Sequence, residues 1–427
     1  MSTDDLSGEL EAQDIAAHPQ LKTSTSVFRH KSFRWFFIAA AISNGAAWMQ
    51  MVAIPALLFD LTGQATWLGF SSLIGSLPAV LLTPHAGVIA DRFSRKKLLL
   101  ITQSVQMTAS FSLFALYSVD QLTPWRIVGI GFLNGIATGY GASTWQAFVP
   151  SLVPEEDMLS AVRLNSVQFT VARMIGPGLA GIVISTFGTG AAILCNASTY
   201  ILVIGVLLVV KTRVGSTASR DLTVKQALIN GATYMWRHLP LRMAVILAFI
   251  SSAFGQSLQF VSAAVSARVF HHPSTDNAGL MTALGVGSTL ASIYATKSVG
   301  RFKRSQTVMT SLVLYCISTA MIAASSIYWI GLLGYFISGM AHLTMAVALN
   351  TLIQGLVPDR MRGRAMSFYL LGVMGGIPMG SFAIGFFGDM FSVRSVIVVD
   401  SCVYLAIILF FRSTKLLDQL NITSLED

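Results

Sequence analysis

Long apolar runs alternate with short polar connections along almost the whole chain. The runs are about twenty residues long, the length that a helix needs to cross a bilayer, and they lack the two-residue alternation of membrane β-strands. A spanning segment must satisfy its backbone hydrogen bonds internally, so each run is interpreted as a helix. Twelve spans are expected, at approximately 35–60, 67–90, 98–118, 124–150, 161–186, 189–211, 241–268, 276–298, 306–324, 327–355, 363–387 and 391–411.

The amino-acid composition indicates what the surface of the protein faces. Charged residues are 11% of the 427 and hydrophobic residues 54%, whereas a soluble domain carries about 25% charged residues. Most of the surface must therefore face lipid, and the predicted fold class is an all-α polytopic membrane protein. The three cysteines (Cys195, Cys316 and Cys402) fall inside expected spans, which indicates no disulfide framework.

Five segments follow from the pattern. Residues 1–26 are polar, lack the apolar core of a cleavable signal peptide, and are expected to form a disordered cytoplasmic tail. Residues 27–211 and 241–412 are two halves with six expected spans each. The linker 212–240 contains the amphipathic stretch "DLTVKQALINGATYMWRHLP", which predicts a helix on the membrane surface. Residues 413–427 form a second cytoplasmic tail.

Lysine and arginine set the orientation. With the N-terminus inside, they fall in tails, inner loops or inner helix ends, except for Arg126, Arg268 and Arg394 outside and Arg173 within a span. The positive-inside rule then places both termini in the cytoplasm. The expected location of the chain is the bacterial cytoplasmic (inner) membrane. This explains the net charge of +9 without a nucleic-acid partner.

The two halves carry an internal repeat. "ADRFSRKKLLL" from Ala90 aligns with "VGRFKRSQTVM" from Val299, "SLVPEED" with "GLVPDRM", and Pro177 with Pro378, each pair about half the chain apart. Two parallel six-helix halves related by an axis normal to the membrane describe a class of secondary transporter.

The loop after the second span carries a more specific pattern. Gly87, Asp91, Arg92, Arg95 and Lys96 have a spacing that resembles the loop 2–3 signature of the major facilitator superfamily. "GATYMWRHLPLR" and "ARMIGPGLAG" resemble the branch that contains enterobactin exporters and macrolide efflux pumps, and the resemblance covers roughly residues 28–412. It implies the major facilitator fold of two six-helix pseudo-repeats working by alternating access.

In that family the loop acid sits near the inner end of span eleven, so the resemblance implies that Asp91 latches the cytoplasmic gate, with Arg362 and Arg364 as candidate partners. Gly87, Arg92 and Arg95 belong to the same gating segment. The alternative is that the basic residues only anchor the topology, which leaves the acid unexplained.

A second gating motif lies in span five. Gly176 and Pro177 resemble a fifth-helix motif associated with antiporters, which favours export. The alternative is ordinary close packing of helices through small residues.

Polar and aromatic stripes mark one face of spans one, four, seven and ten. The resemblance implies that these helices line the central cavity, so the stripes are candidate substrate contacts; polar side chains that only join helices are the alternative. The candidates are Asn44, Trp48, Asn134, Trp145, Gln256, Phe260, Tyr335 and His342.

Three ionisable side chains, Arg173, His342 and Asp400, lie at membrane depth. Such groups are costly there, so each is expected to have a functional or structural role. Arg173 could bind an anionic ligand or bond carbonyls freed by the nearby proline, and it is a further candidate substrate contact. Asp400 and His342 are the proton-coupling candidates, although a structural pairing between them is favoured. The fourth-span arginine linked to coupling in many drug antiporters would fall at Gly131, so coupling must use other groups.

The predicted function is secondary active export of a small organic molecule, such as a siderophore, a macrolide or another drug-like compound, by proton antiport. Uptake by proton symport is the alternative within transport. A membrane-integral enzyme would need a nucleophile–base set or a metal cluster, which the histidine positions do not offer. We expect a monomer with the small-molecule substrate, protons and the lipid bilayer as partners and no cofactor.

Overall fold

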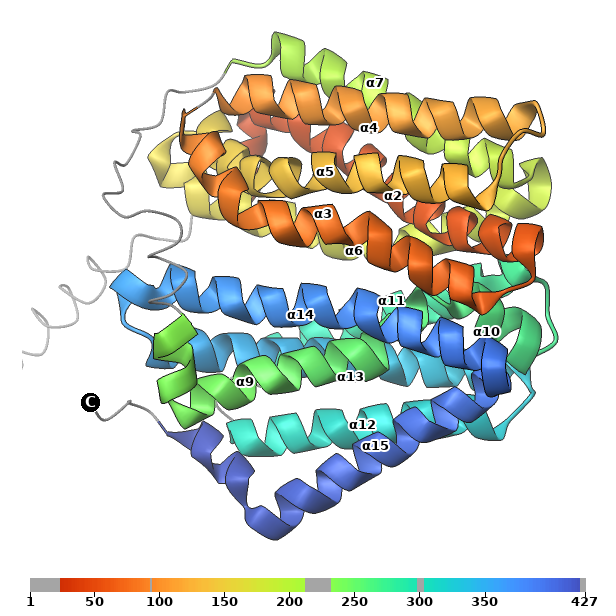
Figure 1. Cartoon of the computed structure of the whole chain (residues 1–427). Coiled ribbons are helices and arrows are strands. Elements are labelled where there is room, and N and C mark those ends of the chain that lie inside the picture. Colours follow the sequence, from red (N-terminus) through yellow and green to blue (C-terminus); the bar gives the residue numbers. More distant parts are fainter. Residues whose placement is uncertain (1–23, 93, 212–231, 298–302, 423–427) are drawn as a thin grey trace, which may run out of the picture.

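The computed structural model describes residues 24–92, 94–211, 232–297 and 303–422. Helices form the first half as a bundle at the top of Figure 1. Their bounds are η1 Ser24–Arg29, α2 Lys31–Thr62, α3 Ala65–Arg92, α4 Arg95–Ser118, α5 Pro124–Phe148, η2 Val149–Leu152, α6 Glu155–Phe187 and α7 Thr189–Val209.

The second half repeats this arrangement below the first (Figure 1). Its helices are α9 Leu239–Ile250, η3 Ser251–Gly255, η4 Gln256–Gln259, α10 Ser262–Val269, η5 Ser274–Asp276, α11 Asn277–Lys297, α12 Arg304–Ala324, α13 Tyr328–Leu356, α14 Asp359–Phe387, η6 Gly388–Ser392, α15 Val393–Thr414 and η7 Leu416–Asn421.

Each of the twelve expected spans coincides with helical structure. Ten described stretches are long and apolar enough to cross a membrane. The last of them contains both α14 and α15, and the expected fourth span is α5. The expected seventh span is not one helix but the broken series from α9 to α10. The all-α polytopic prediction is confirmed.

Local sequence explains where individual helices begin and end. The Thr123 side chain accepts from the Arg126 amide at the start of α5, and Pro124 occupies the first turn, where its missing N–H costs nothing. Gly63 ends α2 in the left-handed conformation, φ 65°, which glycine adopts without strain.

The two halves show the same packing. In the first half α3 packs on α5, and in the second its counterpart α11 packs on α13. The halves meet along two helix pairs, α3 with α14 and α6 with α11. A Cβ on Gly285 of α11 would lie 2.7 Å from the carbonyl oxygen of Arg173 in α6, so only glycine allows this close crossing.

The two ends of the bundle differ. We call the end that carries Lys31, Arg95 and Arg304 the basic end and the opposite end the far end. At the far end one hydrophobic core combines residues of both halves, such as Leu58 and Val265. At the basic end each half has its own core, built from residues 27–210 in one and 235–420 in the other. Correspondingly, α3 and α14 are close at the far end and diverge toward the basic end (Figure 1).

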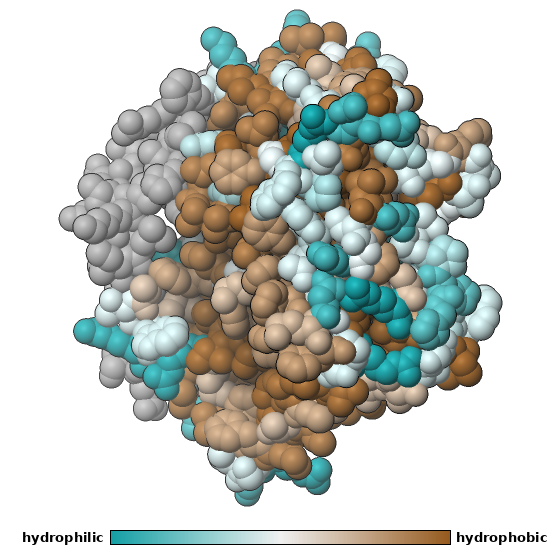
Figure 2. Space-filling view, turned by 45° about the vertical axis from the view of Figure 1, so that its right-hand side comes forward, coloured by the Kyte–Doolittle hydropathy of each residue, from teal (hydrophilic) through white to brown (hydrophobic). Residues whose placement is uncertain are grey.

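The surface is largely apolar. Figure 2 shows a mostly hydrophobic face, with hydrophilic side chains gathered along its right-hand side. Large apolar side chains are well exposed along the helices, for example Val209 at 81% and Phe187 at 77%. Such exposure is expected where lipid replaces water.

Most of the predicted surface helix of the linker lies outside the described residues. Residues 232–237 are helical, and Met235 is buried in the core of the second half at the basic end. The expected tails 1–26 and 413–427 are described only at Ser24–Ser26 and from 413 to 422.

Candidate functional site

The seventh span is broken near its middle. A π-turn, Ser251–Gly255, is followed by a 3₁₀ turn, Gln256–Gln259, before α10 resumes. The buried Ser252 hydroxyl and Gln256 side-chain oxygen have no hydrogen-bond partner among the described residues. Broken helices of this kind place backbone and side-chain polar groups at the ligand sites of transporters.

Tyr335 holds this broken span in place. It is 1% exposed, and its hydroxyl donates to the Leu258 carbonyl at 3.2 Å. Tyr335, which the sequence predicted to contact substrate, therefore supplies a hydrogen-bond donor to a backbone carbonyl of the broken span. Phe260, also a predicted contact, follows the 3₁₀ turn and is partly exposed.

Arg173, Trp48 and His342 come together between the halves. The Arg173 guanidinium lies over the Trp48 ring, 5.3 Å from its centroid, a favourable cation–π geometry. Arg173 also lies within electrostatic range of His342 and Tyr315 in the other half. No carboxylate of the described chain forms an ion pair with Arg173. The structure thus juxtaposes three residues that the sequence had placed on separate spans.

The remaining polar stripes do not all reach this centre. Asn44 is partly exposed, and its amide nitrogen has no partner among the described residues. Asn134 is also partly exposed, and its backbone carbonyl accepts from Thr138. Trp145 donates to Asn165 of α6 at 3.4 Å and packs on an aromatic ring of α2, so it joins helices near the basic end.

Gly176 and Pro177 lie where α2 and α6 cross. A Cβ on Gly176 would come within 2.5 Å of the Trp48 Cβ and 2.9 Å of the Gly45 carbonyl oxygen. Pro177 is buried inside α6, which continues through it to Phe187. The motif therefore places Trp48 against α6, one turn from Arg173.

Asp400 is buried in α15 and is 3% exposed. The expected pairing with His342 is absent: the structure forms no ion pair between these two described residues. Its electrostatic neighbour is Tyr404, whose ring stacks on Tyr315 with centroids 5.1 Å apart. Neither hydroxyl, nor Asp400 Oδ2, has a hydrogen-bond partner among the described residues.

The predicted latch is only partly described. Gly87, Asp91 and Arg92 belong to α3, but their side chains lie outside the described residues. Arg95 donates to the Ala147 carbonyl at 3.2 Å, tying α4 to the end of α5. Arg362 is exposed in the first turn of α14. The latch therefore stays a prediction.

The far end carries a polar contact that sequence reasoning missed, centred on Asp389 between α14 and α15. Its carboxylate accepts from the Ala65 amide at 3.0 Å, and from the Thr66 amide at 2.7 Å and hydroxyl at 2.6 Å. Arg268 donates to the same carboxylate and to the Gly63 carbonyl. We call this group of five residues the far-end lock, because it joins both halves.

Charge and helix geometry favour the lock. Ala65 and Thr66 open α3, and the N-terminus of a helix attracts an anion. Partial burial alone would raise the pKa of Asp389, but the hydrogen bonds from Thr66, Ala65 and Arg268 outweigh burial and bring the pKa below its ordinary value. Asp389 is therefore ionised at neutral pH.

Two further contacts join the halves toward this end. The Ser274 hydroxyl donates to Asp60 at 2.6 Å, and the Asn277 amide donates to the Val52 carbonyl at 3.1 Å. The sequence indicates these contacts between the halves only weakly. Asp60 and Arg268 are charged residues at the ends of spans, and no neighbouring residue indicates their partners.

No group of three or more potential metal-binding His, Cys, Asp or Glu side chains occurs in the described part of the chain.

Comparisons with known proteins agree with this architecture. The profile of a family described as transmembrane secretion effector matches residues 22–425. The staphyloferrin A transporter of Staphylococcus aureus is 24% identical over 393 residues, which cover 90% of this chain and 96% of that protein. The enterobactin exporter EntS of Citrobacter koseri is 22% identical over 364 residues, which cover 84% and 86%.

A crystal structure of a mutant form of the nucleoside transporter NupG has the same fold. The TM-score is 0.78 at 12% sequence identity, and the match covers 90% of this chain and 99% of that one. Because the family profile matches almost the whole chain and the two six-helix halves form the corresponding fold, the chain belongs to the transmembrane secretion effector family of the major facilitator superfamily.

Proposed function

We propose that this transporter exports a small organic molecule from the bacterial cytoplasm by alternating access. The observation that carries the proposal is the convergence of Arg173, Trp48 and His342 between two halves that share a core at the far end and have separate cores at the basic end. Relatives named as a staphyloferrin A transporter and an enterobactin exporter support a siderophore-like cargo.

Orientation follows from charge. The basic end carries the lysines and arginines of the short connections, so the positive-inside rule assigns it and both termini to the cytoplasm. The far-end lock then closes the periplasmic side, and this structure is an inward-facing state ready to accept cargo from the cytoplasm. Alternating access requires the lock to open and the Asp91 latch to form.

The substrate class follows from Arg173. A guanidinium stacked on an indole and without a carboxylate partner among the described residues is available to an anionic group. Its planar fork suits a carboxylate or catecholate through two parallel hydrogen bonds. We therefore favour an acidic, partly aromatic cargo over a cationic one.

Proton antiport is the proposed energy source. Asp400 and His342 are the candidate carriers, because a group that binds and releases protons within a span must be ionisable. Asp400 neighbours Tyr404, whose ring stacks on Tyr315, whereas His342 itself lies within electrostatic range of Arg173. His342 is thus the better placed to couple protonation to cargo binding.

The test is counter-transport in inverted membrane vesicles with an imposed pH gradient and a panel of enterobactin, a macrolide and a cationic dye. Export predicts accumulation inside the vesicles when the lumen is acidic; movement in the opposite sense would establish uptake. Arg173→Gln should weaken binding of the acidic compound about tenfold to a hundredfold while sparing the dye. Arg173→Lys should restore part of the affinity. Equal losses for both compounds with a lower melting temperature would make Arg173 a packing residue.

A further inference from the structure

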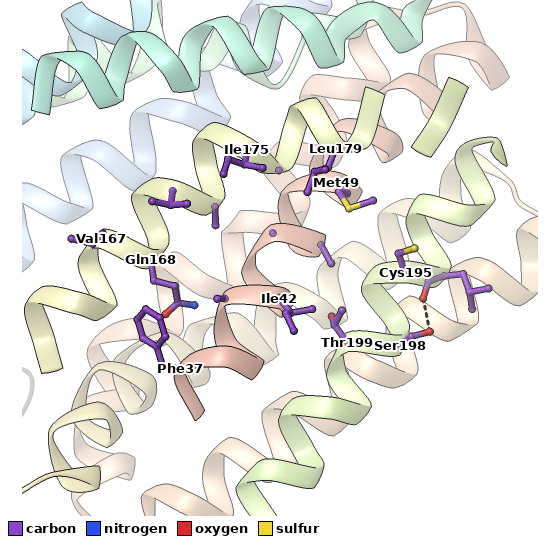
Figure 3. Close-up of a pocket in the computed structure, with 17 residues that line it drawn as sticks. Phe37, Ile42, Met49, Val167, Gln168, Ile175, Leu179, Cys195, Ser198 and Thr199 are labelled. Atoms are coloured by element: carbon purple, nitrogen blue, oxygen red, sulfur yellow. Dashed lines mark hydrogen bonds between the residues drawn. The ribbon is translucent and has the colours of Figure 1, made fainter. Parts of the chain in front are cut away.

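A groove of about 750 Å³ opens between α2, α6 and α7, and its lining residues all belong to the first half. Ile42 and Met49 line it from α2, Ile175 and Leu179 from α6, and Cys195 from α7 (Figure 3). Ile42 is 50% exposed and Ile175 45%, so the groove opens onto the lipid-facing surface. Its volume is in the range of pockets that hold drug-sized ligands, roughly 300–1,000 Å³.

One polar side chain in this apolar groove has no hydrogen-bond partner. Gln168 lines the groove, is only 4% exposed, and has neither side-chain nitrogen nor oxygen bonded to another described residue. Ser198 and Thr199 also line it, but their hydroxyls are satisfied by backbone carbonyls. Buried amides are normally hydrogen-bonded. Gln168 therefore indicates an occupant that offers a hydrogen-bonding group.

Two arginines stand where the groove approaches the basic end. Arg34 lies one turn before Phe37 on α2, and Arg163 lies one turn before Val167 on α6, and both Phe37 and Val167 line the groove. Both arginines are exposed, and neither forms an ion pair with a described residue.

The two arginines also lie at similar depth. His30 bonds Asp157 at 2.8 Å, which fixes the register of α2 against α6. At 1.5 Å per residue, Arg34 is about 6 Å and Arg163 about 9 Å beyond that contact. Gln168 is about 16 Å beyond it. From the basic end inward, the groove thus presents two positive charges, then an amide, then an apolar section lined by residues such as Ile175 and Leu179, which we call the trough.

We propose that this groove binds an anionic phospholipid of the adjacent leaflet. The phosphate lies between Arg34 and Arg163, an ester group bonds the Gln168 amide, and one acyl chain fills the trough. The order of these groups matches the order of a phospholipid from headgroup to tail, and basic pockets between spans select anionic headgroups. That this leaflet is the cytoplasmic one rests on the proposed orientation; the lipid site itself does not depend on transport.

Cys195 provides a probe, because it lines the groove and is exposed. The rate of N-ethylmaleimide labelling would be measured by intact-protein mass spectrometry, with Cys316 and Cys402 replaced by serine. The full chain would be held in nanodiscs of phosphatidylcholine, with or without phosphatidylglycerol. The matched control keeps only Cys402, which is exposed on α15 outside the groove.

Phosphatidylglycerol should slow labelling of Cys195 and leave Cys402 unchanged, with a preference over phosphatidylcholine of about tenfold or more from two arginines. The double variant Arg34→Gln, Arg163→Gln should remove that preference, and the double lysine variant should keep most of it. Gln168→Leu, a change of similar volume, should weaken protection by phosphatidylglycerol at unchanged charge.

Two results would overturn the proposal. Equal protection of Cys195 by both lipids would make the groove an unselective part of the lipid-facing surface. Protection by enterobactin or erythromycin at constant lipid composition would instead assign the groove to the transport pathway. An unchanged control rate in the arginine variants establishes that their fold is intact.

Discussion

Replacing Asp389 by asparagine should open the far end of the transporter. The carboxylate accepts from two amides, one hydroxyl and one guanidinium, and these donors come from Ala65, Thr66 and Arg268. An asparagine of the same shape keeps one acceptor oxygen, loses the negative charge, and turns an NH₂ group toward donors. The perturbation therefore acts on the contact between the halves and on little else.

The magnitude follows from the type of hydrogen bond. A bond to a charged group contributes about 1.5–3 kcal/mol and a neutral one about 0.5–1.5 kcal/mol. Losing the charge and at least one acceptor should cost the closed far end about 2–4 kcal/mol, after allowing for the partial exposure of Arg268. The ratio of far-end-open to far-end-closed molecules should then rise about 30-fold to 1,000-fold.

Double electron–electron resonance between spin labels at Gln121 and Trp329 measures the distance between the halves at the far end, and so the fraction of molecules that are open there. Both residues are exposed at the far end: Gln121 lies in the connection between α4 and α5 of the first half, and Trp329 lies in the first turn of α13 in the second half. The distance distribution should gain a longer component in Asp389→Asn. Asp276→Asn is the matched control, because Asp276 bonds His272 within one half. An unchanged distribution in Asp389→Asn, in a protein that still binds its cargo, would refute the locking role.

The pH dependence supplies a second check. The pKa of Asp389 lies below its ordinary value of 3.8 in the closed state. The lock is therefore at full strength above pH 3.8 and is lost only as the pH falls through the lowered value. The far end should not respond to pH between 5 and 8 through this residue. A distance distribution that changes in that window for wild type, but not for Asp389→Asn, would show that the lock titrates.

Three further variants probe other parts of the fold. Asp400→Asn should lower expression or melting temperature more than coupling; normal folding with loss of pH-driven export and retained binding would make Asp400 the proton carrier. Asp91→Asn should raise cysteine labelling of the basic-end loops, and unchanged labelling with full transport would reduce Asp91 to a topology residue. Gly380→Ala would place a Cβ against the Ala253 carbonyl oxygen, closer than van der Waals contact allows, so it should destabilise the fold by about 1–3 kcal/mol in a thermal melt. Gly375→Ala, with open space around it, should be neutral.

The spans can be predicted from the amino-acid sequence alone, because a helix in lipid satisfies its own backbone hydrogen bonds and needs only about twenty apolar residues. It also indicated the two-half organisation and the family, since the motif at Asp91 and the repeated Pro177 and Pro378 are local patterns. Arg173 could also be identified from the sequence, because a charged residue inside an apolar span is costly and is recognised without knowing how the helices pack.

The contacts between side chains of different helices could not be predicted in this way. Asp389 and Thr66 are 323 residues apart, and their contact exists only because α3 and α14 come together at the far end. The same packing set Arg173 over Trp48 and left Asp400 beside Tyr404 instead of His342. In the broken span seven the Leu258 carbonyl accepts a hydrogen bond from Tyr335, which is 77 residues away. Such contacts depend on how helices cross, and a helix presents the same periodicity in sequence whichever neighbour it meets.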